Sequence, residues 1–265
     1  MSKRVVFITD ADSKSGQALV RRFARDGSGL LLNSVSGGEA LQECLDSARA
    51  FGCEAVVANI DLCRSAEVAA LLAEAETKLG SVDVLLHNQC AISPAGVEHG
   101  DEAAFLNIVQ ANAKTAFFCT QAVGKQMAAR GSGAVVFVGS IHADKPAGAS
   151  MPFSASQGAV KMLAREAALF LGRYGVRVNM IEMGPVEGAA EQFRSDISAL
   201  YDSYRYKVPS GLPGTYEDMA ELAYFLAGAE SRYVNGADIR LDGGFLMHYM
   251  DHRMKKPDDL EVDPA

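Results

Sequence analysis

Residues 4–27 read "RVVFITDADSKSGQALVRRFARDG", and this stretch indicates the class of the fold. Its first part, 4–10, is a short apolar and β-branched run, which predicts a buried strand. Its later part, 16–27, carries apolar residues at helical spacing and ends on Gly27, a common helix-terminating residue. A strand that passes directly into a helix is the first half of a βαβ unit.

The same alternation continues along the chain. Further apolar runs lie at 29–35, 54–62, 82–88, 133–140, 176–184 and 238–244, and helical patterns lie at 39–51, 65–79, 101–129 and 154–172. Continuous Val, Ile and Leu strands separated by helices are typical of a parallel sheet that is covered on both faces. With right-handed crossovers, we expect a single α/β domain with a doubly wound, Rossmann-type sheet over residues 1–245. Residues 246–265 form a C-terminal extension.

Composition limits the function. The chain has 265 residues, of which 49% are hydrophobic and 22% charged, as expected for one large α/β domain. Its formal net charge of -8 disfavours a nucleic-acid partner. No run reaches the roughly 18 to 20 apolar residues that span a bilayer, so we expect no membrane partner. The five cysteines are scattered without a C-x-x-C pair. They indicate free thiols in a reducing cytoplasm and no metal site.

Several motifs lie in register along these elements. They are "TDADSKSG" (9–16), Asp61, "HNQC" (87–90), Asn112, Ser140, "MGPV" (183–186) and "FLAGAESRYVNGADIRLDGG" (225–244). Together they resemble the short-chain dehydrogenase/reductase family from residue 4 to about 245. The resemblance implies an NAD(P)-dependent alcohol dehydrogenase fold, with Thr9, Gly16, Asp61 and Asn88 at cofactor-binding positions.

The resemblance also places the catalytic residues, and two of them are replaced. Ser140 and Asn112 match the family's serine and asparagine, but Phe153 and Gln157 stand at its tyrosine and lysine positions. Phe153 has no ionisable group and cannot exchange a proton, a loss of about 10² to 10⁴ in rate. Gln157 is neutral. We therefore expect no catalytic residue here, with Ser140 and Asn112 left as vestiges.

The cofactor turn departs from the family pattern as well. Its first two glycines are replaced by Asp10 and Lys14, and only Gly16 remains. Those glycines let the backbone approach a pyrophosphate closely. Asp10 and Asp12 also bring two carboxylates toward a doubly charged group. Like charges at 4 Å repel by about 1 kcal/mol in water and about 4 near a protein surface. We therefore expect that this chain binds no cofactor, and that Thr9, Gly16, Asp61 and Asn88 are vestigial.

Two separate departures predict a non-catalytic subunit, structural or regulatory, of an oxidoreductase complex. Family members assemble through the helices that correspond to 101–129 and 154–172. The resemblance thus implies a heterotetramer with a catalytically complete paralogue. One arrangement it resembles is a two-subunit alcohol dehydrogenase that acts on an acyl-CoA and in which one subunit lacks the active site. The Met-rich tail, 245–265, is expected to reach the partner.

Two other hypotheses stay open. The chain is either an NAD(P)-dependent oxidoreductase with a rewired active site that uses His142, Glu182 or Lys161, or a regulator that binds a metabolite without turnover. The sequence does not choose between NAD and NADP, because residues 33–35 after the second strand carry neither an acidic nor a basic signal.

Overall fold

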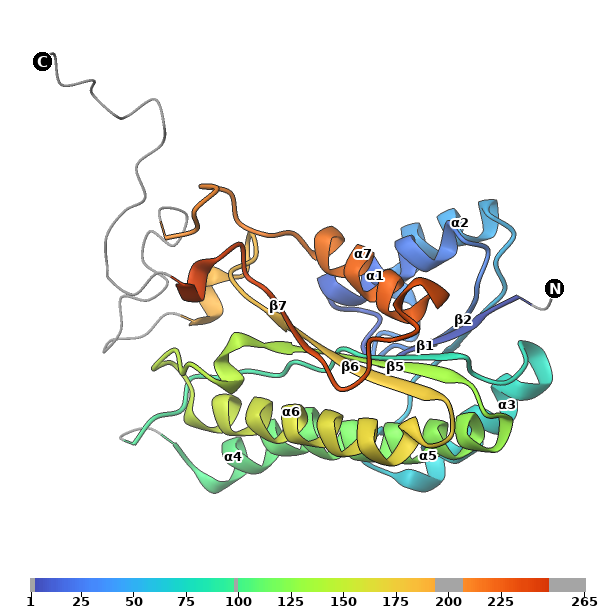
Figure 1. Cartoon of the computed structure of the whole chain (residues 1–265), viewed down its shortest axis with the longest axis horizontal. Helices are drawn as coiled ribbons and strands as arrows, with labels where there is room; N and C mark the ends of the chain where they lie inside the picture. The colour runs from blue at the N-terminus through green and yellow to red at the C-terminus, as the bar shows by residue number, and fades with distance from the viewer. Residues whose placement is uncertain (1–2, 98–99, 194–206, 248–265) are drawn as a thin grey trace, which may run out of the picture.

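A seven-stranded parallel sheet forms the centre of the molecule, with strand order β3-β2-β1-β4-β5-β6-β7 (Figure 1). The structure, a computed structural model, describes residues 3–97, 100–193 and 207–247. The strands are β1 (Val5–Ile8), β2 (Gly29–Asn33), β3 (Ala55–Ala58), β4 (Val84–His87), β5 (Gly133–Ser140), β6 (Val176–Met183) and β7 (Asp238–Leu241). The predicted α/β class and the parallel sheet are confirmed.

Helices cover both faces of the sheet (Figure 1). One layer contains α1 (Lys14–Ala24), α2 (Gln42–Ala50) and α7 (Tyr216–Ala227). The other contains α3 (Ser65–Lys78), α4 (Glu102–Val109), α5 (Thr115–Arg130) and α6 (Met151–Gly172). A π-helical segment, η2 (Gln110–Lys114), joins α4 to α5 within the predicted helix 101–129. In the described part of the chain, no helix is long and apolar enough to cross a membrane.

Each face of the sheet has its own hydrophobic core, because successive strand residues point to opposite faces. In β1, Val5 and Phe7 join the core beneath α3, α5 and α6, whereas Val6 and Ile8 join the core beneath α1, α2 and α7. All four side chains are at most 1% exposed. Burial on both faces explains why the strands read as unbroken apolar runs.

The strand order reverses direction between β1 and β4, the two central strands. In open α/β sheets, ligands bind in the crevice at the carboxyl ends of the strands, at such a reversal. The segments that follow β1, β2, β4, β5 and β6 meet at this edge, and they contain most of the residues that the sequence singled out.

The predicted boundary near residue 245 stays a prediction. Phe245 packs against Ile141 and Val208 of its own chain, as part of a small third core, and does not face outward. The remainder of the Met-rich tail, from residue 248, lies outside the described residues.

Candidate active site

The turn between β1 and α1 presents the start of a helix to the crevice. Ser13 caps α1, since its Oγ accepts a hydrogen bond from the Gly16 N–H at 3.1 Å. A Cβ at position 16 would lie 1.9 Å from the Asp10 carbonyl oxygen, so only glycine lets the helix pack on the turn. The free N–H groups and the dipole of a helix start attract anions. The feature that binds a pyrophosphate is therefore retained.

Thr9 and Asn88 hold this turn in shape. Asn88 donates from Nδ2 to the Asp10 carbonyl at 2.7 Å, and its Oδ1 accepts from the Asp10 N–H at 2.9 Å. The Asn88 N–H donates to Thr9 Oγ1 at 3.0 Å. Both side chains are buried. Three of the four predicted cofactor positions, Thr9, Gly16 and Asn88, thus converge at one place.

The fourth position, Asp61, behaves differently. It is exposed, accepts a hydrogen bond from the Cys63 N–H at 2.8 Å and forms an ion pair with Arg64 at 3.3 Å. No hydrogen bond or ion pair among the described residues joins it to the turn after β1. Its role toward a cofactor stays a prediction.

Only one of the two carboxylates of the turn, that of Asp12, is bonded away from the start of α1. Asp12 is hydrogen-bonded to Ser34 and Ser36, beyond the end of β2. Asp10 accepts a long hydrogen bond from the Ser13 N–H at 3.4 Å, and burial raises its pKa. These contacts hold both acidic groups against neighbouring backbone and hydroxyl groups.

Lys14 adds a positive charge to the same opening. Its Nζ lies 3.6 Å from where a Cβ on Gly188 would be, so the side chain reaches from α1 to the loop after β6. An ammonium group between these two segments complements a pyrophosphate. The replacement of a glycine by lysine has therefore supplied a cation at an anion-binding helix start.

Asn112 lies in the π-helical segment and ties three segments together. Its Nδ2 donates to the Ala91 carbonyl at 2.8 Å and to Ser156 Oγ at 2.9 Å, while its Oδ1 accepts from the Ala91 N–H at 2.7 Å. π-Helical turns are frequent at functional sites. Asn112 fixes the segment after β4 against α6, which carries positions 153 and 157.

Ser140, His142 and Phe153 meet beyond the end of β5. The His142 N–H donates to Ser140 Oγ at 3.2 Å, and its ring centroid lies 6.3 Å from that of Phe153. The ring of Phe193 lies 4.9 Å from His142 and 5.8 Å from Phe153. An imidazole thus packs beside the phenyl ring that occupies the family's tyrosine position.

The contact of the His142 ring identifies its tautomer. Nδ1 lies 2.6 Å from the Lys145 carbonyl oxygen. Because a carbonyl only accepts, Nδ1 carries the proton and Nε2 carries the lone pair. Burial lowers the pKa of His142, and the hydrogen bond to Lys145 offsets part of that effect. The ring is therefore neutral at pH 7, with its proton on Nδ1.

Gln157 is fully buried, yet neither its Nε2 nor its Oε1 has a hydrogen-bond partner among the described residues. Its Oε1 lies 2.9 Å from where a Cβ on Gly139 would be, next to β5. An unpaired buried amide costs about 1–3 kcal/mol. Such a group is suited to a ligand hydroxyl. With the cationic helix start, the residues present fit a nicotinamide dinucleotide.

Lys161 and Glu182, the other proposed substitutes, neutralise each other. Lys161 Nζ lies 2.6 Å from Glu182 Oε1 and 2.5 Å from Asp144 Oδ2. Burial lowers the pKa of Lys161, but the hydrogen bonds to Asp144 and Glu182 outweigh it, so the net shift is upward. A lysine that stays protonated is no base. Lys161 is also buried, which sequence reasoning did not anticipate.

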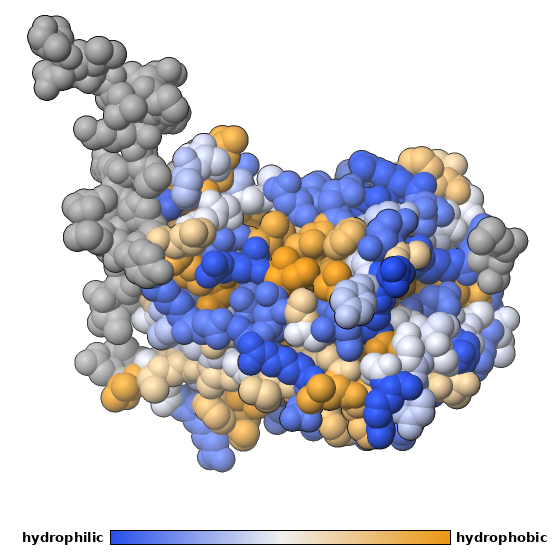
Figure 2. All heavy atoms as spheres, in the orientation of Figure 1, coloured by the Kyte–Doolittle hydropathy of each residue, from blue (hydrophilic) through white to orange (hydrophobic). Residues whose placement is uncertain are grey.

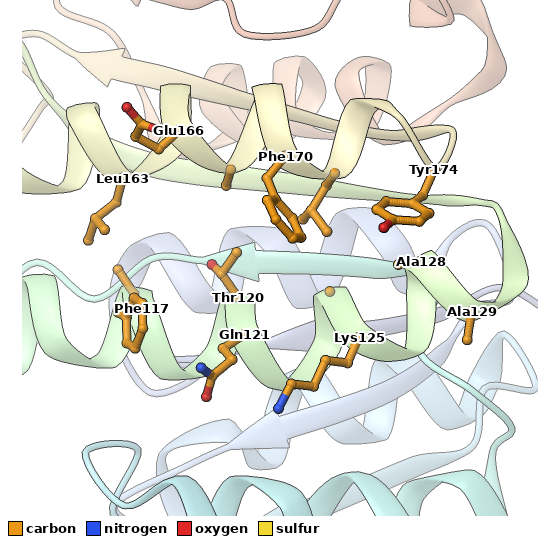
Figure 3. Close-up of a pocket in the computed structure, with 14 residues that line it drawn as sticks. Phe117, Thr120, Gln121, Lys125, Ala128, Ala129, Leu163, Glu166, Phe170 and Tyr174 are labelled. Atoms are coloured by element: carbon orange, nitrogen blue, oxygen red, sulfur yellow. The ribbon is translucent and has the colours of Figure 1, made fainter.

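An apolar groove lies away from this site, between α5 and α6 (Figure 3). Its volume is about 670 Å³, and the rings of Phe117, Phe170 and Tyr174 line it together with Lys125 and Glu166. Phe170 is 62% exposed. Figure 2 shows apolar side chains along the edge of the molecule that α6 occupies in Figure 1.

The known proteins to which this chain is similar are named as reductases or dehydrogenases. The family model described as enoyl-(acyl carrier protein) reductase matches residues 11–246. "Short-chain dehydrogenase/reductase eriH" of Hericium erinaceus is 31% identical over 254 residues, covering 92% of this chain and 98% of that protein. "L-rhamnose 1-dehydrogenase (NAD(P)(+))" of Azotobacter vinelandii is 29% identical over 251 residues, covering 92% and 97%. The crystal structure of levodione reductase superposes with a TM-score of 0.84 at 27% identity, covering 94% and 100%.

These findings correct two expectations. The prediction of a non-catalytic subunit is wrong, because the matching family and the similar proteins are oxidoreductases. The prediction that the chain binds no cofactor is contradicted by a relative named for NAD(P)+. The loss of two glycines from the β1–α1 turn was misleading because Gly16, the glycine that lets α1 pack on this turn, is retained. None of these three relatives is named as an inactive subunit. From residue 11 to 246, this chain belongs to the short-chain dehydrogenase/reductase family.

Proposed function

We propose that this chain is an NAD(P)-dependent oxidoreductase that interconverts an alcohol and a carbonyl through a rewired active site. In this proposal His142 takes the proton-transfer role that Phe153 cannot perform. The proposal rests on one observation: Ser140 and Phe153 both contact His142, and the hydrogen bond to Lys145 fixes the neutral tautomer of His142.

Within the proposal the cofactor is held by groups from four segments. The start of α1 and Lys14 bind the pyrophosphate, the Thr9–Asn88 pair keeps the turn rigid, and the Gln157 amide receives a ribose hydroxyl. The bound dinucleotide accepts or supplies the hydride. A neutral amide at position 157 orients a hydroxyl but adds no positive charge, unlike the family's lysine.

Ser140 and His142 act on the substrate, Ser140 by orienting it and His142 by taking its proton. The Ser140 hydroxyl donates to the substrate oxygen and orients it. Nε2 of His142 accepts the alcohol proton as the carbonyl forms, and the Lys145 carbonyl stabilises the resulting imidazolium through the Nδ1–H. Phe153 and Phe193 exclude water from the ring. The pairing of Lys161 with Glu182 leaves neither of them suited to this role.

Titration of the full-length protein with NADH and NADPH, followed by nicotinamide fluorescence, tests the proposal. We expect saturable binding of at least one dinucleotide below about 1 mM, the upper range of enzyme affinities for substrates. A panel of secondary and cyclic alcohols with NAD+ and NADP+ should then give reduced cofactor. Absence of saturable binding by either dinucleotide would contradict the proposal. Binding without turnover of any alcohol would favour the metabolite-binding regulator.

Replacing Lys14 by alanine is expected to weaken dinucleotide binding about two- to fivefold, the size of a solvent-exposed charge contact. The loss should shrink at high salt, because exposed charges are screened. A Lys78→Ala variant is the matched control, since Lys78 pairs with Glu74 on the surface of α3. Equal affinities of the Lys14 variant and the wild type would place the pyrophosphate elsewhere.

We also propose that the groove between α5 and α6 receives the same face of a second copy of this chain. Lys125 and Glu166 both line the groove (Figure 3), and in this proposal a two-fold axis pairs each cation with the other copy's carboxylate. The exposed rings of Phe117, Phe170 and Tyr174 supply apolar area for such an interface. Assembly with a paralogue, as in the predicted heterotetramer, is the other outcome of the test.

Replacing Phe170 by glutamate should convert the purified oligomer into a monomer, because two like charges would face each other across the axis. Light scattering after size-exclusion chromatography measures the mass. Phe51→Glu is the matched control, since Phe51 is 52% exposed and follows α2 on the other layer. A wild type that is monomeric alone and assembles only with a paralogue would support the heterotetramer instead.

A further inference from the structure

The carboxylate of Asp12 is bonded to the turn that follows β2, far along the chain. Oδ1 accepts hydrogen bonds from Ser34 Oγ at 2.6 Å and Ser36 Oγ at 3.0 Å, and Oδ2 accepts from the Ser36 N–H at 2.8 Å. Ser34 Oγ in turn accepts from the Gly38 N–H at 2.8 Å. Asp12 thereby organises residues 34–38.

This position has a chemical meaning in dinucleotide-binding folds. An acidic side chain near the end of the second strand hydrogen-bonds the 2′-hydroxyl of the adenosine ribose, whereas an arginine there accommodates the 2′-phosphate of NADP. The residues that follow β2 here, Ser34 to Ser36, include no acid or base. The fold instead brings a carboxylate to that place from the β1–α1 turn.

The neighbours of Asp12 favour its charged form. Burial raises its pKa, but the hydrogen bonds from Ser34 and Ser36 outweigh burial and make the net shift downward. A carboxylate has about four lone-pair sites. Hydrogen bonds from Ser34, from Ser36 and from the Val35 backbone occupy these sites, so the carboxylate acts on a ligand through its charge. Among the described residues, no lysine or arginine forms an ion pair with Asp12.

The surroundings also suit an adenosine. Val35, between the two serines, leaves 76% of its surface exposed, and its backbone is fixed by a hydrogen bond from Asn59 Nδ2 to its carbonyl at 2.9 Å. An exposed apolar side chain beside an ionised carboxylate offers contact to a purine.

We propose that Asp12 makes this chain select NAD(H) over NADP(H). The inference rests on the proposed oxidoreductase function and settles the cofactor choice that residues 33–35 leave open. A ribose 2′-hydroxyl brings no charge to the carboxylate, whereas a 2′-phosphate brings a dianion that the carboxylate repels. The carboxylate that distinguishes a 2′-hydroxyl from a 2′-phosphate therefore belongs to the β1–α1 turn.

Binding of NADH and NADPH to the full chain, measured by calorimetry near neutral pH, tests the proposal. We expect the wild type to prefer NADH by about 30-fold, which corresponds to about 2 kcal/mol. In Asp12→Asn the ratio should fall to within about threefold, mainly through tighter NADPH binding, because the amide removes the repulsion and can donate to a phosphate.

Asp10→Asn is the matched control, since it removes a carboxylate from the same turn that is not bonded to the residues after β2. Its ratio should equal that of the wild type. A parallel titration with 5′-AMP and adenosine 2′,5′-bisphosphate should show the same preference for the ligand without a 2′-phosphate. Because the two ligands differ only in that group, the result would place the origin of the preference at the ribose. Thermal melts confirm that both variants are folded.

Equal affinity of the wild type for NADH and NADPH would overturn the proposal while leaving the oxidoreductase function intact. A preference that persists in Asp12→Asn, or disappears in Asp10→Asn, would overturn it too. If neither dinucleotide binds the wild type, the proposed function fails together with this inference.

Discussion

A His142→Gln variant is expected to oxidise alcohols about 10² to 10⁴ times more slowly than the wild type, the range for losing a general base. Glutamine keeps a polar side chain of similar reach but cannot take up a proton at any relevant pH. Affinity for NADH should change little, because the contacts described for His142, with Ser140, Lys145 and two aromatic rings, all lie outside the cofactor turn.

The pH dependence of the wild type gives a second readout. Burial lowers the pKa of His142 from its ordinary value of 6.5. A base must be deprotonated to act, so kcat/KM for alcohol oxidation should be constant at neutral pH and fall only below that value. The fall should be absent from the residual activity of His142→Gln. An inflection well above neutrality would indicate a different base.

Glu182→Gln is the informative comparison. Glu182 is paired with Lys161, so this variant should keep activity within severalfold of the wild type while losing stability. If activity collapsed in Glu182→Gln and survived in His142→Gln, the assignment of the base would be wrong and the rewired site would depend on the carboxylate.

Acid is expected to destabilise the fold through His87, the second large effect. His87 is 1% exposed, and burial lowers its pKa from 6.5 to about 3. Below pH 6.5 the unfolded chain binds a proton at this residue and the folded chain does not. Stability therefore falls as pH drops toward 3, by about 1.4 kcal/mol per unit, or roughly 2–3 kcal/mol between 6.5 and about 4.5.

The surroundings of His87 explain why it resists protonation. The Thr115 hydroxyl donates to the Ala111 carbonyl at 2.5 Å, so its oxygen accepts from Nε2–H of His87 at 3.0 Å. Nδ1 has no hydrogen-bond partner in the described part of the chain, and the Phe137 ring lies 5.6 Å away. A hydrogen bond to the backbone of His87 itself favours the protonated ring, but burial outweighs it and lowers the pKa.

Urea unfolding at neutral pH and at about pH 4.5, for the wild type and His87→Asn, isolates this effect. Acidic side chains also titrate in this range, and they do so equally in both proteins. The wild type should therefore lose about 2–3 kcal/mol more than the variant on acidification. Parallel losses would show that His87 is protonated in the folded state.

The fold was predictable from the sequence because strand and helix periodicities are local. The runs at 133–140 and 65–79 correspond to β5 (Gly133–Ser140) and α3 (Ser65–Lys78) within one residue. The predicted ends of other strands were less accurate: residues 34 and 35 were assigned to a strand, but β2 ends at Asn33. The serine side chain at 34 bonds Asp12 there, a contact no local pattern contains.

The sequence by itself also predicted, from motif spacing, that Phe153 and Gln157 stand at the family's tyrosine and lysine positions. It could not determine which residues take over the roles of that tyrosine and lysine. The Asp12 carboxylate reaches Ser34 across 22 residues, and Lys161 finds Glu182 on a neighbouring strand. Such contacts join segments that are distant in the chain, and they depend on where packing places the loop after each strand. Tertiary structure alone therefore decided that Asp12 is bonded to the residues after β2, that Lys161 is paired with Glu182, and that an imidazole lies beside Phe153.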